Sequence, residues 1–224
     1  MTKLSEFSFD KRLVLSMIAI IDYRAGNAPS VLNALRRIGA SGSLTSFPEL
    51  LKSADAIILP GVGSADATVS SLDEMGLLNI IEKRVIEDKV PFLGICVGLQ
   101  VLFEHSEEGD TKCLGWFKGE VRRFSERVRV PQIGWNEVKF KGEHPLIRDC
   151  GPSDFFYFVN SYYVVPEDES LEIGTTDYDG AFCSLIAKGN IMASQFHLEK
   201  SGEAGLKILK NFADIASERG DLSC

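Results

Sequence analysis

Short apolar runs alternate with helical patterns over the first hundred residues of the chain. Three runs, rich in β-branched residues, are long enough for buried strands, and they span residues 17–21, 54–59 and 90–95. Between the first two, apolar residues recur at helical spacing up to Gly39. Residues 64–88 are typical of one or two helices, and residues 96–104 of another. Such alternation predicts a parallel sheet whose strands are connected by helices.

The pattern changes after about residue 110. Strand-like runs separated by turn residues cover residues 113–123, 128–140, 155–165, 171–176 and 182–195. A last helix is expected over residues 201–218. The order predicts an α/β layered domain with a central mixed, mostly parallel sheet flanked by helices. We expect this single domain over residues 17–224, after an N-terminal extension of uncertain role at residues 1–16.

The composition is that of an ordinary globular protein. Of 224 residues, 45% are hydrophobic and 25% are charged, which argues against a disordered chain, a collagen or a coiled-coil rod. The net charge of −8 argues against a nucleic-acid partner. No apolar run reaches the ~18–20 residues of a membrane-spanning helix, so no membrane partner is expected. The five cysteines form no C-x-x-C pair and no histidine cluster has metal spacing, which predicts a reducing cytoplasm and no metal or cofactor.

The strongest signal for chemistry is Gly94-Ile-Cys96-Val-Gly98, between an expected strand and an expected helix. It is the cysteine version of the nucleophile elbow, in which flanking glycines permit a sharp turn that lifts the nucleophile above the sheet. The N-terminus of the following helix would favour a thiolate at Cys96, and the N–H of Val97 could donate to an oxyanion. The alternative is a buried structural cysteine in a glycine-rich turn.

A candidate base lies in Gln195-Phe-His197-Leu-Glu199, directly after an apolar run. His197 would accept the proton of Cys96. Glu199 lies two residues on, on the same side of an extended segment, where its carboxylate could orient the imidazole and stabilise its cation. An isolated H-x-E is more often a surface histidine beside an ordinary glutamate, but here it follows a cysteine elbow.

Other segments could complete the same site. The two glycines of Pro60-Gly-Val-Gly63 would let backbone N–H groups approach a ligand, as in an oxyanion hole. Glu108 could face the site from beyond the elbow helix. Within residues 155–163, Ser161 and Tyr162 could present donors to a small polar ligand, whereas the aromatic residues are expected in the core: Phe155, Phe156 and Phe158.

In their order along the chain, these motifs resemble the class I (triad-type) glutamine amidotransferases. The motifs include Leu59-Pro-Gly-Val-Gly63, Pro91-Phe-Leu-Gly-Ile-Cys-Val-Gly-Leu-Gln100, Gly134-Trp-Asn136 and Ser194-Gln-Phe-His197. The full set, from about residue 17 to 215, is most similar to the glutaminase subunits of imidazole glycerol phosphate synthases.

The resemblance implies that Cys96 attacks the side-chain carboxamide of glutamine and that His197 and Glu199 complete a triad. It implies an oxyanion loop at Gly61, Val62 and Gly63, and glutamine-binding positions at Gln100, Glu108, Ser161 and Tyr162. It also implies a heterodimer with a (β/α)8-barrel cyclase, which would use the ammonia to make imidazole glycerol phosphate in histidine biosynthesis.

Several positions depart from the usual pattern of that family: Arg24, Ala28-Pro29, Gln132, Asn160 and Leu198. We expect the first three departures near the cyclase face or on the surface, and the loss of a proline at Leu198 to loosen Glu199. Two alternatives stay open. The ammonia could serve a different synthase, such as one that amidates a surface-polysaccharide sugar, or the chain could be a non-catalytic regulatory subunit on the same scaffold.

Overall fold

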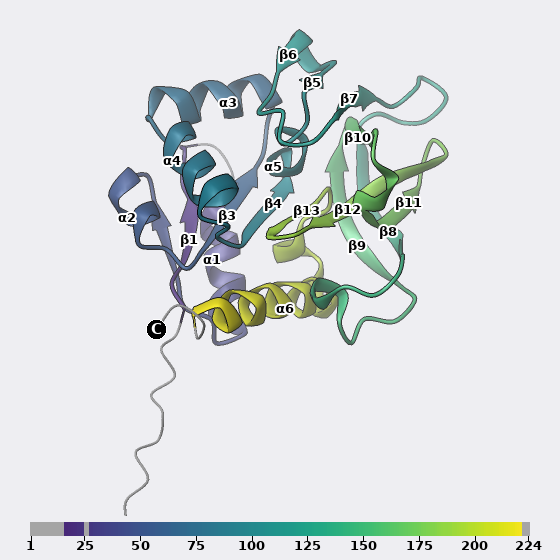
Figure 1. Cartoon of the computed structure of the whole chain (residues 1–224). Coiled ribbons are helices and arrows are strands. Elements are labelled where there is room, and N and C mark those ends of the chain that lie inside the picture. Colours follow the sequence, from purple (N-terminus) through teal and green to yellow (C-terminus); the bar gives the residue numbers. More distant parts are fainter. Residues whose placement is uncertain (1–15, 25–26, 221–224) are drawn as a thin grey trace, which may run out of the picture.

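Five parallel strands form one side of the sheet, beginning at its edge, in the computed structural model, which describes residues 16–24 and 27–220 (Figure 1). Their spatial order is β2-β1-β3-β4-β13, and their bounds are Gly42–Thr45, Ile18–Ile21, Ala56–Gly61, Phe92–Cys96 and Ile191–Ser194. All residues of β1, β3, β4 and β13 are buried, as in a parallel sheet covered on both faces. The expected extension lies outside the described residues except for Ser16.

Beyond β13 the sheet continues through pairs of strands that are antiparallel with one exception. β12 (Ala181–Lys188) pairs with β13, and the path continues through β10 (Tyr162–Pro166), β7 (Gly119–Arg123), β5 (His105–Ser106) and β6 (Thr111–Lys112). A branch leaves β12 through β11 (Glu172–Asp177), β8 (Gln132–Phe140) and β9 (Ser153–Asn160). The prediction of an α/β domain with a central mixed sheet is therefore confirmed.

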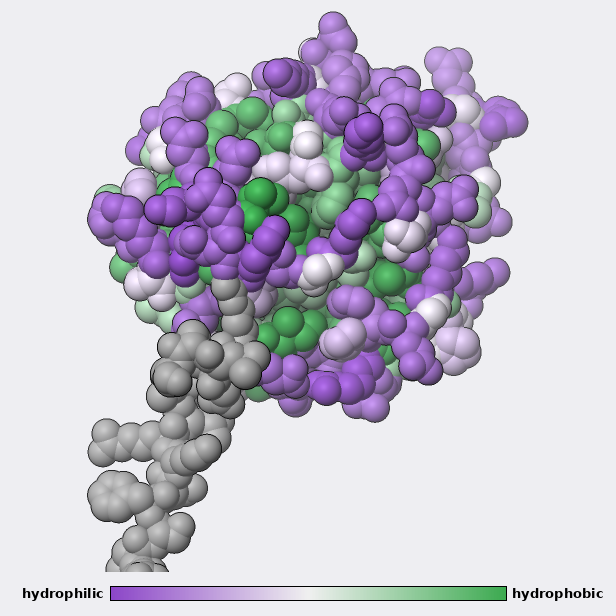
Figure 2. All heavy atoms as spheres, viewed as in Figure 1, coloured by the Kyte–Doolittle hydropathy of each residue, from purple (hydrophilic) through white to green (hydrophobic). Residues whose placement is uncertain are grey.

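Helices cover both faces of the parallel strands (Figure 1). α1 (Ala28–Arg37) and α6 (Gly202–Gly220) contact each other, and α3 (Ala65–Glu74) and α4 (Leu78–Glu82) lie on the opposite side. The remaining helices are α2 (Pro48–Lys52), α5 (Val97–Gln100), a π turn at Lys83–Glu87 and 3₁₀ turns at Glu108–Asp110, Pro145–Ile147, Glu169–Leu171 and Leu198–Lys200. No helix in the described ranges is long and apolar enough to cross a membrane. Hydrophilic residues dominate the face in Figure 2, and hydrophobic residues appear only in separate areas between them.

The expected elbow helix over residues 96–104 is too long. α5 ends at Gln100, and the carbonyls of Val101, Leu102 and Phe103 accept hydrogen bonds from residues 114–117 instead of from the next helical turn. Two strand-like runs are also each divided into two strands: residues 155–165 break at Ser161, and residues 182–195 turn at residues 189–190. The run 113–123 is a strand only from residue 119. The ends of these elements are therefore set by hydrogen bonds and strand pairing with residues that are distant in the sequence.

Candidate active site

A strained turn carries the candidate nucleophile. β4 ends at Cys96, α5 begins at Val97, and Cys96 has φ 57° and ψ −109°, a conformation that L-residues rarely adopt. The parallel register places Gly61 of β3 beside Cys96, so the loop after β3 meets the elbow at the same edge of the sheet. The thiol is almost completely buried.

Three glycines allow the elbow to pack closely. A Cβ on Gly98 would lie 2.1 Å from the carbonyl oxygen of Leu59, and a Cβ on Gly94 would lie 2.3 Å from that of Gly98. A Cβ on Gly61 would lie 2.6 Å from the backbone nitrogen of Gly98. These contacts involve backbone atoms that cannot rotate away, so β3, β4 and α5 require glycine at all three positions.

We expect Gly98→Ala to lower the free energy of unfolding by about 3 kcal/mol or more, because the added methyl group overlaps a backbone carbonyl of the central sheet. Urea unfolding measures the change. Gly151→Ala is the matched control, since its methyl group would only meet the carbonyl oxygen of Ser153 at 3.7 Å. Equal midpoints for both variants would contradict the packing argument.

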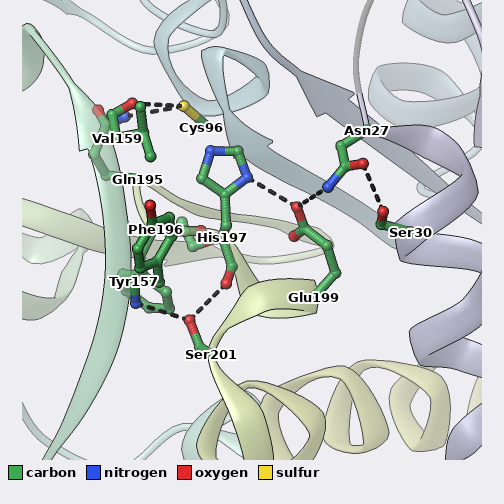
Figure 3. A network of polar contacts seen from close by, with 11 residues as sticks. Asn27, Ser30, Cys96, Tyr157, Val159, Gln195, Phe196, His197, Glu199 and Ser201 are labelled. Carbon is green, nitrogen blue, oxygen red and sulfur yellow. Dashed lines mark hydrogen bonds and ion pairs between the residues drawn. The ribbon is translucent and has the colours of Figure 1, made fainter. Parts of the chain in front are cut away.

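The candidate base lies next to the elbow because β13 pairs in parallel with β4, with Ser194 opposite Ile95. The chain therefore leaves both strands at the same edge of the sheet. Nδ1 of His197 lies 2.9 Å from Oε1 of Glu199, and Figure 3 shows the imidazole ring between this carboxylate and Cys96. Only 4% of the His197 side chain and 1% of the Glu199 side chain are exposed.

Hydrogen bonds from other elements hold the imidazole and the carboxylate in place. Asn27, before α1, donates from Nδ2 to Oε1 of Glu199 at 2.9 Å, and Ser30 donates to Oδ1 of Asn27 at 2.6 Å. Ser201 donates from Oγ to the carbonyl oxygen of His197 at 2.5 Å (Figure 3). No role was predicted for these three residues from the sequence.

The charges at this site stabilise each other. Burial by itself would lower the pKa of His197, but its interactions with Cys96 and Glu199 outweigh burial and raise that pKa to about 10. Burial opposes ionisation of Glu199, yet hydrogen bonds from His197 and Asn27 bring the pKa of Glu199 below its ordinary value. The arrangement therefore favours an imidazolium that lies between a carboxylate and the sulfur atom.

A pocket of about 290 Å³ opens over Cys96. This volume is at the lower end of the range for ligand pockets, so the pocket suits a ligand smaller than a typical drug molecule. The structure brings most of the predicted residues to its wall: Val62, Gly63, Cys96, Val97, Gln100, Glu108, Ser161, Tyr162 and His197. Gly61 and Glu199 do not line the pocket, since Gly61 is buried in β3 and Glu199 contacts His197. The wall also contains Pro131, Val159, Asn160 and Lys200, which no sequence motif marked as site residues.

Glu108 is fixed at the pocket by a helix N-terminus. Its Oε2 accepts a hydrogen bond from the backbone nitrogen of Ala65 at 3.1 Å, in the first turn of α3. The other histidines do not line the pocket: His105 contacts Asp110 at 2.7 Å, and His144 accepts from the backbone nitrogen of Leu146. Within the described residues, no group of three His, Cys, Asp or Glu side chains could hold a metal ion.

The unusual residues at the departure positions fit our expectation only in part. Gln132 is buried rather than at the surface, and it lies opposite Asn160 in the pairing of β8 with β9. Ala28 is also buried, whereas Arg24 and Pro29 are exposed. Leu198 is fully buried, and the expected loosening of Glu199 is not seen, because two hydrogen bonds hold its carboxylate.

Comparison with known proteins agrees with this geometry. The family model for glutamine amidotransferase class-I matches residues 19–216. The imidazole glycerol phosphate synthase subunit HisH of Dehalococcoides mccartyi strain 195 is 48% identical over 201 residues, which cover 89% of this chain and 98% of that protein. The subunit HisH of Herpetosiphon aurantiacus is 47% identical over 91% of this chain and 97% of its own.

Solved structures share the fold at low sequence identity. A crystal structure of a glutamine amidotransferase has a TM-score of 0.71 and 21% identity, and covers 88% of this chain and 98% of its own. A putative GMP synthase subunit from Thermoplasma acidophilum has a TM-score of 0.70 and 16% identity, with coverage of 93% and 98%. Because both identities are low, these structures support the fold alone.

Proposed function

The chain belongs to the class-I glutamine amidotransferase family, and from this premise we propose that it hydrolyses glutamine for an imidazole glycerol phosphate synthase in histidine biosynthesis. The observation that carries the proposal is that Cys96 and His197 line one small pocket, while Glu199 holds His197 through a hydrogen bond. The names of the HisH relatives supply the pathway. They do not favour the alternative in which the ammonia goes to a sugar-modifying synthase.

In the proposed mechanism, the Cys96 thiolate attacks the carboxamide carbon of glutamine. The resulting oxyanion would be stabilised by the N–H of Val97 and by the loop of Gly61, Val62 and Gly63. His197 gives its proton to the departing nitrogen, so that ammonia leaves and a glutamyl thioester remains. Water then attacks the thioester while His197 takes one of its protons, and glutamate leaves as the Cys96 sulfur is released.

The pocket wall offers complementary groups for the α-carbon end of glutamine. The carboxylate of Glu108 and the amide oxygen of Gln100 are acceptors that suit an ammonium group. Ser161 and Tyr162, which also line the pocket, offer donors for a carboxylate. We assign glutamine recognition to these four residues.

An exposed apolar face lies beside the pocket, and we propose that the cyclase binds there. Ile133 and Trp135 on β8 and Phe155 and Val159 on β9 are 36–59% exposed, so Phe155 does not belong to the core as its sequence suggested. The antiparallel register places Ile133 opposite Val159, and Trp135 opposite Tyr157. Val159 also lines the pocket, so the apolar face reaches the place where ammonia forms. Such an exposed patch is typical of a protein interface.

We expect Trp135→Ala to weaken the complex with the cyclase about tenfold or more, because a large aromatic side chain at an interface carries much of the binding energy. Isothermal titration of the chain with the cyclase measures the dissociation constant. Phe47→Ala is the control, since Phe47 is 66% exposed and lies outside β8 and β9. Equal weakening by both substitutions would contradict the assigned face.

Glutamate release tests the proposed function directly. We would measure it for the chain alone, with a histidine-pathway cyclase, and with that cyclase and its nucleotide ligand. Strong stimulation in the third condition is the expected result. No stimulation, with Cys96 still labelled by a glutamine-like electrophile, would contradict the histidine-pathway assignment and favour another synthase. An unreactive Cys96 would favour the non-catalytic alternative.

A further inference from the structure

Gln195 lies directly beside the nucleophile without facing the pocket. It is the first residue after β13, and the register that pairs Ser194 with Ile95 places it next to Cys96. Its side chain is fully buried, and its backbone nitrogen donates to the carbonyl oxygen of Ser184 at 2.8 Å. Gln195 is not among the residues that line the pocket. A contact with the substrate therefore does not account for this buried amide.

The side-chain amide of Gln195 connects Cys96 to Gln100. Its Nε2 lies 3.6 Å from Sγ of Cys96, as Figure 3 shows. Its Oε1 accepts a hydrogen bond from Nε2 of Gln100 at 3.1 Å. Gln100 in turn donates from the same nitrogen to the carbonyl oxygen of Tyr162 at 3.2 Å.

The orientation of both amides follows from the backbone. The carbonyl of Tyr162 can only accept, so Gln100 must turn its NH₂ group toward it. Gln195 must then turn its oxygen toward Gln100 and its own NH₂ group toward the sulfur of Cys96. An N–H group stabilises a thiolate more than a thiol, because hydrogen bonds to charged acceptors are the stronger ones.

We propose that Gln195 is a positioning residue. Its amide stabilises the thiolate of Cys96 and fixes the position of the sulfur relative to the side chain of Gln100. This role deepens the proposed function and rests on it, because it concerns the nucleophile for glutamine hydrolysis. Both NH₂ hydrogens of Gln100 are used within the protein, so only its oxygen is left for the substrate. Gln195 thus links the atom that attacks glutamine to a residue assigned to recognise it.

The pH dependence of Cys96 alkylation tests this role, using the full chain and iodoacetamide. The alkylation rate follows the fraction of Cys96 that is thiolate. Mass spectrometry of the peptide that contains Cys96 distinguishes its alkylation from that of the other cysteines. Methionine has a similar length to glutamine but no hydrogen-bond donor. In Gln195→Met we therefore expect the pH midpoint of Cys96 alkylation to rise by about one pH unit. At any pH below both midpoints, alkylation should then be about tenfold slower than in the unmodified chain.

Two further variants make the result specific. Ser194→Ala removes a neighbouring buried hydrogen bond, from Ser194 Oγ to the carbonyl oxygen of Phe196, without touching Cys96, and its midpoint should not change. Gln195→Asn keeps the amide but withdraws it by one methylene group, so it should raise the midpoint with less disturbance of the fold. An unchanged midpoint in either folded Gln195 variant would overturn the proposal.

Failure of this inference can be separated from failure of the proposed function. Glutamate release by the unmodified chain with the cyclase and its ligand tests the function. Release of glutamate together with unchanged midpoints in the Gln195 variants would remove only the positioning role. Shifted midpoints without glutamate release would support the sulfur contact and contradict the glutaminase assignment.

Discussion

Replacing Cys96 with alanine will abolish glutamine-dependent synthesis by the proposed complex with a cyclase and leave ammonium-dependent synthesis intact. Among the described residues that line the pocket, Cys96 is the one cysteine and therefore the one that can form the thioester, so we expect glutamine hydrolysis to fall by about 10⁴-fold or more. Besides its interaction with His197, the sulfur lies 3.6 Å from Nε2 of Gln195 and 3.8 Å from the carbonyl oxygen of Val159, and both of these contacts are long, so its removal should not disturb the fold. Ammonium added to the solution would bypass the missing step.

The matched control for this experiment is Cys113→Ala, another buried cysteine that does not line the pocket. It should retain both activities, which are followed as glutamate release and as formation of the cyclase product. Loss of the ammonium-dependent activity in Cys96→Ala would mean that Cys96 is structural. Retained glutamine hydrolysis in that variant would remove Cys96 from the mechanism.

The central strands could be predicted from the sequence because each is a short apolar run that is buried on both faces. Residues 17–21, 54–59 and 90–95 correspond to β1, β3 and β4 within two residues at each end. β2 and α2 were not expected, because β2 is only half-buried and has no continuous apolar run. A strand at the edge of the sheet carries a weaker signal than one at its centre.

The boundaries that the sequence could not define depend on distant partners. The segment after Gln100 is apolar and could continue a helix, but its carbonyls bond to residues 114–117. The run 182–195 looks continuous, yet Gly189 has φ 60° there, and the chain reverses so that β13 can pair with β4. Nothing in the sequence next to these positions indicates such pairing.

The candidate triad could be proposed from sequence because the strand ends carry the chemistry. Parallel neighbours end at the same edge of a sheet, so an elbow after β4 and a histidine after β13 meet once those strands pair. Asn27 and Gln195 could not be given roles in this way. Each acts on the triad through a side-chain hydrogen bond to a residue at least 99 positions away, and no spacing rule predicts such a contact.

Glu199→Gln should reduce kcat for glutamine hydrolysis by about 100-fold or more, with a much smaller effect on KM. The carboxylate accepts from Nδ1 of His197 at 2.9 Å and supports its cation, whereas Glu199 does not line the pocket. A neutral amide keeps the size and the contact with Asn27 but removes the charge. The imidazolium that protonates the departing amide nitrogen is then less stable.

The same substitution should shift the pH dependence of hydrolysis in a defined direction. The pKa of His197 is raised to about 10, so its cation persists below that pH and is lost as the pH rises through it. Without the carboxylate the pKa of His197 falls, and the alkaline limb of kcat/KM moves to lower pH. Glu203→Gln is the control, because the Glu203 side chain is 92% exposed and contacts only Arg37 among the ion pairs of the described residues. An alkaline limb that stays in place in Glu199→Gln would mean that Glu199 does not support the His197 cation, and the base of the triad would need another partner.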